Sequence, residues 1–197
     1  MLKRLFDILF AQAMLTATLP LIAIISVLIK CETKGPVLFR QRRWGKNMRT
    51  FRALKFRTMT VCPDAGTPTR AGQRVTRFGA LLRASGVDEL PQILNILVGQ
   101  MSFVGPRPLA VGETVRDRHG REIPYEAMRL FHARMRSQPG LTGLAAICLA
   151  KDTPPARKFR YDLIYLKKRT FCLDLRLIAL TFGVCFRFGW EKMEKKR

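Results

Sequence analysis

Asp88 and Glu89 are adjacent carboxylates in a chain whose other charges are overwhelmingly basic. The 197 residues include 36 lysines and arginines against 14 aspartates and glutamates, a formal net charge of +22. Adjacent carboxylates can divide labour, because one can act as a nucleophile while the other holds a divalent cation. The alternative is that the pair complements the N-terminus of a helix, where negative charge is favoured. For these two residues alone the helix interpretation is the commoner one.

Four cations could accompany the pair in a phosphate-binding site. Lys55 and Arg57 are alternate residues of a predicted strand, so they share one side of it. Arg83 shortly precedes the pair, and Arg107 lies in a Gly-Pro-Arg-Pro loop. Guanidinium groups bind phosphate oxygens in bidentate fashion and a metal can bridge such oxygens, so this set could hold a substrate with two phosphates. The alternative for each is a solvated or membrane-contacting surface cation.

Arg107 differs from the other three cations because its backbone is restricted. Pro106 and Pro108 flank it, and Gly105 precedes them. A side chain on such a rigid loop is preorganised at low conformational-entropy cost. This favours a functional role for Arg107 over a surface role.

The elements that must position these residues begin with an apolar segment. From Ile8 to Ile29 the chain carries no charged residue, and a straight helix of that length would run about 33 Å, close to the roughly 30 Å of a bilayer's hydrocarbon core. The run is too long for a signal peptide and lacks a cleavage site. Because both ends are basic and Pro20 interrupts the middle, the pattern supports a re-entrant hairpin and a spanning, kinked helix equally.

Composition bounds the class of protein. A hydrophobic fraction of 48% is normal for one globular unit, so the excess charge does not signal disorder. A charge of +22 implies a polyanionic partner, which could be nucleic acid, an anionic membrane or a phosphate-bearing substrate. The five cysteines lack metal-ligand spacing, which predicts reduced thiols in a protein exposed to the cytoplasm.

Local patterns predict an α+β domain that is mainly helical. Extended segments at 35–39 and 50–59 form a predicted hairpin around a basic turn at 40–47. Asp88 is expected to open a helix that ends at Gly99. The remaining assignments are a polar loop at 60–76, stiff loops at 105–108 and 139–143, and helices at 78–84, 113–137 with a break at 120–124, 158–168 and 173–190.

The order and spacing of these motifs resemble those of the bacterial sugar transferases, also called small monotopic phosphoglycosyl transferases. Each motif is weak alone, whereas the set spans nearly the whole chain and is specific. The matching positions are Lys3-Arg4 with Asp7, Gly35-Pro36-Val37 with Phe39, Gln41, Arg43 and Gly45, residues 55–59, 88–92, 101–109 and 139–143, and Lys158-Phe159 with Asp162 and Tyr165.

The resemblance implies a two-step exchange on the cytoplasmic face of the bacterial inner membrane. The residue matching Asp88 attacks the β-phosphate of a UDP-sugar and expels UMP. Polyprenyl (undecaprenyl) phosphate then accepts the phosphosugar, which initiates assembly of a surface glycan. The resemblance ties Glu89 to a Mg²⁺ ion that offsets diphosphate charge. The phosphate-binding candidates are Lys55, Arg57, Arg83 and Arg107, and the other expected active-site residues are Asp162, Pro106 and Pro108.

The resemblance also implies how the chain is organised around the membrane. It favours a re-entrant membrane helix over 1–31, bent at Pro20, followed by one catalytic unit over 32–197. The composition of the segment at 173–190 predicts an interfacial amphipathic helix, and a buried core helix is an equally good alternative there. Expected partners are the two substrates, membrane lipids, a second copy in a homodimer and downstream glycosyltransferases, with no nucleic acid. The rival interpretation is a non-catalytic, basic membrane adaptor that binds anionic partners. That rival accounts for the charge but not for Asp88 and Glu89 between rigid basic loops.

One region departs from the family pattern. Many relatives carry an Ala-Gln-Val-Asn-Gly-Arg-like run after residues 139–143, whereas this chain has mostly small apolar residues followed by Lys151 across 144–151. The expected amide and arginine are therefore replaced. This difference bears on sugar selectivity, and the sequence names neither the UDP-sugar nor the glycan pathway.

Overall fold

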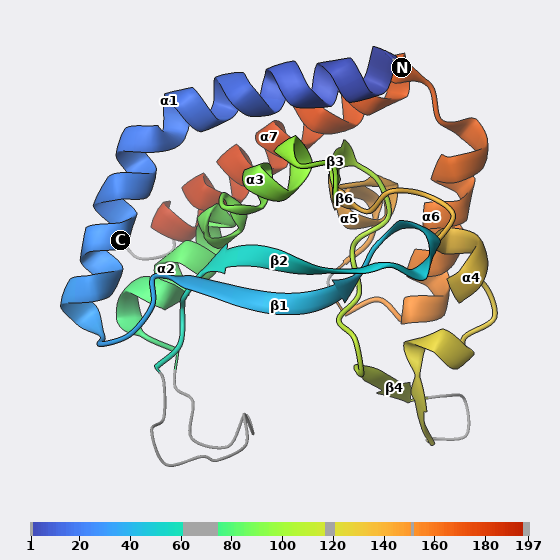
Figure 1. The fold of residues 1–197 in the computed structure, drawn as a ribbon, viewed down its shortest axis with the longest axis horizontal. Helices are drawn as coiled ribbons and strands as arrows, with labels where there is room; N and C mark the ends of the chain where they lie inside the picture. The colour runs from blue at the N-terminus through green and yellow to red at the C-terminus, as the bar shows by residue number, and fades with distance from the viewer. Residues whose placement is uncertain (1, 61–74, 117–120, 151, 195–197) are drawn as a thin grey trace.

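The computed structural model describes residues 2–60, 75–116, 121–150 and 152–194 (Figure 1). The chain begins with one long helix, α1 (Leu2–Glu32), which is apolar and long enough to cross a membrane. Only 11% of its most apolar window is buried inside the protein. Such a helix is compatible with membrane association and differs from the mostly buried core helix of a soluble domain.

α1 is a single bent helix. Figure 1 shows it crossing the top of the molecule and then turning down one side. Pro20 lies inside the helix and has no N–H to donate to the carbonyl of Thr16. The hydroxyls of Thr16 and Thr18 donate one turn back, to the carbonyls of Gln12 and Met14, at 3.0 and 2.7 Å, and such bonds favour bending. The bend agrees with the kink expected at Pro20, while the re-entrant path stays a prediction.

Large apolar side chains are exposed on α1 and on the last helix, α7 (Phe171–Glu194). The two helices meet at the start of α1, where the Phe6 and Phe171 rings pack edge to face at 5.3 Å between centroids. An apolar surface of this extent marks a membrane or partner contact. Its members are Leu2, Leu5, Ile8, Leu9, Leu19, Leu21, Ile24, Val27 and Leu28 of α1, and Leu175, Leu180 and Phe182 of α7.

The predicted hairpin is confirmed, but its turn is shorter than expected. Strands β1 (Leu38–Trp44) and β2 (Thr50–Phe56) pair antiparallel, with Phe39 opposite Lys55. Most of the stretch 40–47, predicted as a turn, belongs to β1 instead. Residues 40–43 alternate between exposed and half-buried positions, with Arg40 and Arg42 exposed, and this is compatible with a strand that has one solvated face. The turn itself contains the 3₁₀ helix η1 (Lys46–Met48).

The segment carrying the two carboxylates is a short 3₁₀ turn between two helices. Asp88 therefore does not open an α-helix, as the sequence pattern predicted. Gly86, with φ of 73°, ends the preceding helix in the left-handed conformation that glycine adopts without strain. The end of the following helix at Gly99 is confirmed within a residue or two. The elements are α2 (Arg77–Ser85), η2 (Val87–Glu89) and α3 (Gln92–Leu97).

The two stiff loops predicted at 105–108 and 139–143 lie against each other. The first loop follows strand β3 (Ser102–Val104), and the second contains strand β6 (Gly140–Thr142). The two strands pair in parallel. The amide of Gly105 donates to the carbonyl of Thr142 at 2.9 Å. A Cβ added at Gly140 would meet the Gly105 nitrogen at 2.1 Å, so only glycine permits this backbone approach.

The helix predicted over 113–137 is mostly wrong. This region forms a small antiparallel hairpin and two short helices, because residues such as Val115 and Ile123 favour strands and Pro124 restricts helix formation. The helices predicted at 78–84, 158–168 and 173–190 are confirmed. The elements here are β4 (Thr114–Arg116), β5 (Glu122–Pro124), η3 (Tyr125–Ala127), α4 (Phe131–Arg134), α5 (Leu144–Cys148) and α6 (Pro155–Lys168).

α3 occupies the centre of the main core. Ile93 and Ile96 are fully buried among residues of α1, β2, β3 and α7. Asn95 on the same helix accepts from the Leu54 amide at 3.0 Å and donates to the Arg52 carbonyl at 2.9 Å. These bonds fix β2 beside α3, so Lys55 is carried next to the carboxylate turn. Most of the polar loop predicted at 60–76, and Lys151, lie outside the described residues.

Candidate active site

Glu89 forms ion pairs with two of the predicted cations. Its Oε1 accepts from Lys55 Nζ at 2.5 Å and from Arg107 Nη2 at 2.7 Å. Burial works to raise the pKa of Glu89, but the charges of Arg107 and Lys55 outweigh it and hold this pKa below its usual range. Glu89 is therefore an ionised group that ties β2 to the 105–108 loop.

Asp88 differs from its neighbour in its ionisation. Burial raises the pKa of Asp88; the Lys55 charge opposes this shift, while the negative Glu89 reinforces it. The charges of Arg83 and Arg107 lower the same pKa more weakly. Among the described residues, Glu89 makes the ion pairs of this carboxylate pair and Asp88 makes none. Asp88 is thus the less neutralised and more basic carboxylate, which suits a nucleophile among cations.

Arg83 also reaches this site. Its Nε donates to the buried Thr58 hydroxyl at 2.8 Å, and its charge acts on the Asp88 carboxyl. Three of the four predicted phosphate-binding cations, Lys55, Arg83 and Arg107, are therefore brought to the carboxylate turn. Together they surround the pair with the positive charge that a diphosphate requires.

Arg57 has a different environment. Its guanidinium donates to the Thr33 carbonyl at 2.7 Å, the Thr33 hydroxyl at 2.6 Å and the Lys34 carbonyl at 2.8 Å. Arg57 is buried, with 6% of its surface exposed. These contacts connect the end of α1 to the end of β2. They also occupy Nη1 and Nη2, the guanidinium donors that would otherwise bind phosphate. The structure therefore favours a structural role for Arg57.

The 105–108 loop is held from three sides. The Pro106 carbonyl accepts from the Gly140 amide at 2.9 Å, and the Pro108 carbonyl accepts from Arg43 Nη1. The backbone carbonyl of Arg107 accepts from Arg134 Nη2. The two prolines are buried while the Arg107 side chain is 54% exposed, so a fixed backbone presents a solvated guanidinium.

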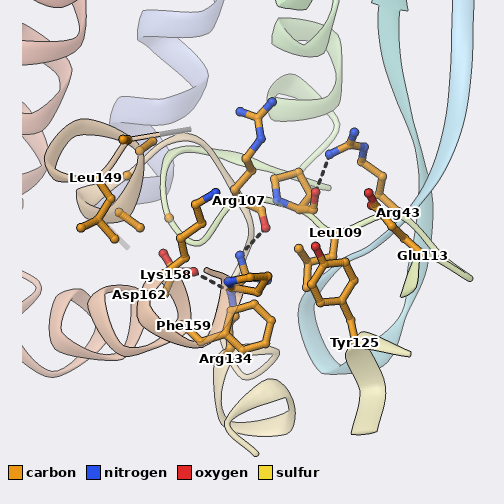
Figure 2. Close-up of a pocket in the computed structure, with 17 residues that line it drawn as sticks. Arg43, Arg107, Leu109, Glu113, Tyr125, Arg134, Leu149, Lys158, Phe159 and Asp162 are labelled. Atoms are coloured by element: carbon orange, nitrogen blue, oxygen red, sulfur yellow. Dashed lines mark hydrogen bonds and ion pairs between the residues drawn. The ribbon is translucent and has the colours of Figure 1, made fainter. Parts of the chain in front are cut away.

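Asp162 acts on this loop through Arg134. Arg134 Nε donates to Asp162 Oδ2 at 2.6 Å, and both side chains are almost fully buried (Figure 2). Burial raises the pKa of Asp162 and lowers that of Arg134, while their mutual attraction opposes both shifts. Arg134 also lies over the Phe159 ring, with its Cζ 4.8 Å from the centroid. Asp162, predicted at the active site, thus lies behind the Arg107 loop and is not in contact with the carboxylate pair.

Sequence reasoning did not single out Arg134. It lies in the charge-rich region where a helix was predicted, and one arginine among many is usually a surface cation. Its burial depends on the packing of α4 against α6, which no local pattern reveals. The only available signal was the nearby apolar spacing of Phe131 and Met135, which are both buried.

A pocket of about 440 Å³ opens beside Arg107. The loop residues 105 and 107–109 form one side, and Tyr125 and Glu113 lie near them. The α5 region, which departs from the family pattern, supplies another side with Ala145, Ala146, Leu149 and Ala150. The site therefore combines a carboxylate turn with an adjoining cavity, joined at Arg107.

The carboxylates fit a metal ion only in company with a substrate. Within the described residues no group of three or more histidine, cysteine, aspartate or glutamate side chains could hold a metal. Mg²⁺ is commonly bound by one or two carboxylates together with substrate phosphates. Both ion pairs of Glu89 fall on Oε1, so Oε2 and the Asp88 carboxylate are the donors that suit such an ion.

Comparisons with known proteins show which family this chain resembles. The family model described as bacterial sugar transferase matches residues 1–188. The chain is 39% identical over 186 residues to an exopolysaccharide production protein of Rhizobium leguminosarum bv. phaseoli, covering 90% of this chain and 91% of that protein.

Two further relatives have names that specify a reaction. The chain is 40% identical over 188 residues to the undecaprenyl-phosphate glucose phosphotransferase of Komagataeibacter xylinus. It is 38% identical over 186 residues to the UDP-N-acetylgalactosamine-undecaprenyl-phosphate N-acetylgalactosaminephosphotransferase of Aeromonas hydrophila. The matches cover 91% of this chain in both cases, but only 35% and 42% of those longer proteins.

Proposed function

The chain belongs to the bacterial sugar transferase family, and from this premise we propose that it moves a sugar 1-phosphate from a UDP-sugar to polyprenyl phosphate, releasing UMP. The observation that supports this most is the turn at Asp88 and Glu89, where Lys55, Arg83 and Arg107 converge on two carboxylates. The relatives named above act on undecaprenyl phosphate, and the same acceptor class is proposed for this chain.

The first step is attack by an Asp88 carboxylate oxygen on the β-phosphorus of the UDP-sugar. A bond forms between this oxygen and phosphorus, and the bond from phosphorus to the bridging oxygen breaks, so UMP leaves with the bonding electron pair. The carboxylate and the diphosphate are both anionic, so their approach needs cations. Arg107 and Lys55 lie within 2.7 Å of the neighbouring carboxylate and can turn toward the phosphates. One donor aimed at developing charge contributes about 2.7–4 kcal/mol to such a step.

In the second step an oxygen of polyprenyl phosphate attacks the same phosphorus. The acyl-phosphate bond breaks, Asp88 regains its carboxylate, and the product is polyprenyl diphosphate-sugar. Mg²⁺, when bound, would supply positive charge to the diphosphate. Glu89, already ionised, and Asp88 are the residues proposed to hold it.

The lipid acceptor requires the reaction to take place at a membrane. The exposed apolar side chains of α1 and α7 offer a surface for the hydrocarbon region, and the charge of +22 favours an anionic leaflet. The cytoplasmic face of the inner membrane is the proposed location, because UDP-sugars are soluble donors and α1 has basic flanks. Homodimer formation, bound lipids and contacts with downstream glycosyltransferases remain predictions from the family resemblance.

UMP release tests the proposed function. Full-length protein purified from membranes would be incubated with undecaprenyl phosphate, Mg²⁺ and each of a panel of UDP-sugars. We expect UMP release that depends on one donor and on the lipid, and that is absent with Asp88→Asn. If wild-type protein releases UMP from no donor but still binds anionic vesicles, the non-catalytic adaptor replaces the enzyme.

A further inference from the structure

The pocket beside Arg107 has two walls of different chemistry. Figure 2 shows Leu149 on one side of the cavity and the Tyr125 ring on the other, with Arg134 and Asp162 between them. Ala145 and Ala146 extend the apolar wall on the side of Leu149. The pocket is therefore a slot between an aliphatic surface and an aromatic one, with charged groups at its base.

We propose that this pocket binds the uracil nucleoside of the UDP-sugar and retains UMP after the first step. The inference rests on the proposed function and adds where each half of the donor lies. Arg107 lines the pocket and also reaches Glu89 at 2.7 Å. A nucleoside in the pocket thus places its diphosphate across Arg107 toward Asp88, and the sugar lies on the far side of the carboxylate turn.

The apolar and aromatic walls favour the nucleoside over the sugar, although charged side chains also line the pocket and can bond hydroxyls of either group. A hexose carries hydroxyls around its whole rim, and each hydroxyl that faces the alkyl wall without a partner costs about 1–3 kcal/mol. Ala145, Ala146 and Leu149 offer only alkyl groups to such hydroxyls. A pyrimidine has two faces that need no hydrogen bonds, and stacking of a base on an aromatic ring contributes about 1–3 kcal/mol. Tyr125 is half-buried and provides that ring.

A buried donor at the base of the pocket also points to a ligand. Arg134 lines the pocket and is 2% exposed. Its Nε and Nη2 are bonded to Asp162 and to the Arg107 carbonyl, but its Nη1 is buried with no hydrogen-bond partner within the described residues. A buried donor in this state costs free energy that a ligand oxygen would recover. Uracil carbonyls and ribose hydroxyls are acceptors of this kind.

Binding of UMP without turnover tests this assignment directly. Ala146→Trp places an indole on the apolar wall, whereas Ala156→Trp makes the same change at another exposed helical alanine that does not line the pocket. Titration calorimetry would compare UMP affinity for the wild-type protein and the two variants. We expect Ala146→Trp to weaken UMP binding by about tenfold or more, equivalent to about 1.4 kcal/mol, and Ala156→Trp to leave it unchanged.

A second variant guards against a local folding defect. Tyr125→Leu removes the aromatic face and keeps an apolar side chain. Because the Tyr125 ring also lies 6.0 Å from the Phe159 ring between centroids, we expect a small loss of melting temperature together with weaker UMP binding by protein that is still folded. The inference is overturned if UMP affinity is normal in both Ala146→Trp and Tyr125→Leu, or if the wild-type protein binds no UMP. It is also overturned if Ala146→Trp raises the KM for the UDP-sugar but leaves UMP affinity intact, since the sugar would then occupy the pocket. Loss of the proposed function has a separate signature, because it requires wild-type protein that releases no UMP.

Discussion

Arg107→Lys should reduce turnover strongly although it keeps the positive charge. Arg134 donates a hydrogen bond to the Arg107 carbonyl and so holds the rigid loop in place. The loop therefore cannot shift to bring a lysine ammonium to the position of the Arg107 guanidinium. An ammonium is a point charge and cannot reproduce a planar, bidentate contact with phosphate oxygens. If that contact is made mainly in the transition state, its loss costs about 2–4 kcal/mol, or roughly 30- to 1000-fold in rate.

The same change should hardly affect folding. In the free protein Arg107 contacts Glu89 at 2.7 Å, with 54% of the Arg107 side chain and 19% of the Glu89 side chain exposed. Lysine keeps a positive charge beside Glu89, and Lys55 still pairs with it, so the change should cost about 1 kcal/mol or less. The melting temperature of Arg107→Lys should therefore stay close to that of the wild-type protein. A large loss of rate with normal stability separates a catalytic contribution from a structural one.

UMP release at saturating Mg²⁺ and lipid phosphate measures this effect. Arg136→Lys is the matched control, because Arg136 is also exposed and lies outside the carboxylate turn and the pocket lining. The control should keep its activity. Near wild-type kcat and KM for Arg107→Lys, with normal membrane association, would refute the reasoning and make Arg107 a surface cation.

The remaining predictions concern stability, positioning and topology. Burial raises the pKa of Asp88, so ionised Asp88 destabilises the folded protein above that pKa. Asp88→Asn should therefore melt at a higher temperature than the wild-type protein at pH 7, with the difference shrinking toward pH 4. An equal or lower melting temperature at pH 7 would contradict this. Arg57→Met should lower the unfolding free energy by roughly 3 kcal/mol, since it abandons buried carbonyl contacts, yet keep UMP release per folded molecule; a selective loss of turnover would return Arg57 to the phosphate site. Asp162→Asn should lower kcat and stability together, because it breaks a buried pair worth about 3–5 kcal/mol to disrupt, and lost activity at unchanged stability would mean direct substrate contact. Single cysteines at positions 2 and 34, in a variant without native cysteines, should label from the same side of the membrane if α1 is re-entrant, and labelling from opposite sides would establish a spanning helix.

The sequence predicted the parts of the fold that depend on local periodicity. The 50–59 strand, the helix at 158–168 and the apolar N-terminal helix follow from alternation or helical spacing within one segment. The same reasoning failed at 40–47, because charged side chains on a solvated strand resemble a turn. It failed again at 113–137, where short strands pair across a tight hairpin.

The cluster of residues at the candidate site was predictable where residue types carried the chemistry. Asp88, Glu89, Lys55, Arg83 and Arg107 do converge, in agreement with the family resemblance. Long-range packing decided the rest of the site. No local pattern indicates that the 105–108 and 139–143 loops pair through parallel strands, or that a lone arginine in α4 is buried behind them. Arg57 is the opposite case. Strand alternation predicted it on the same side as Lys55, but its guanidinium binds backbone carbonyls that directly follow α1.

A covalent phosphosugar on Asp88 is the most direct test of the account. Wild-type protein would be incubated with its UDP-sugar and Mg²⁺ in the absence of lipid phosphate, then quenched and analysed by peptide mass spectrometry. The account predicts an added mass of one phosphosugar on the peptide that contains Asp88, absent from Asp88→Asn and lost when undecaprenyl phosphate is added. UMP release by wild-type protein at full rate with no adduct, or an Asp88→Asn enzyme that still turns over, would contradict it.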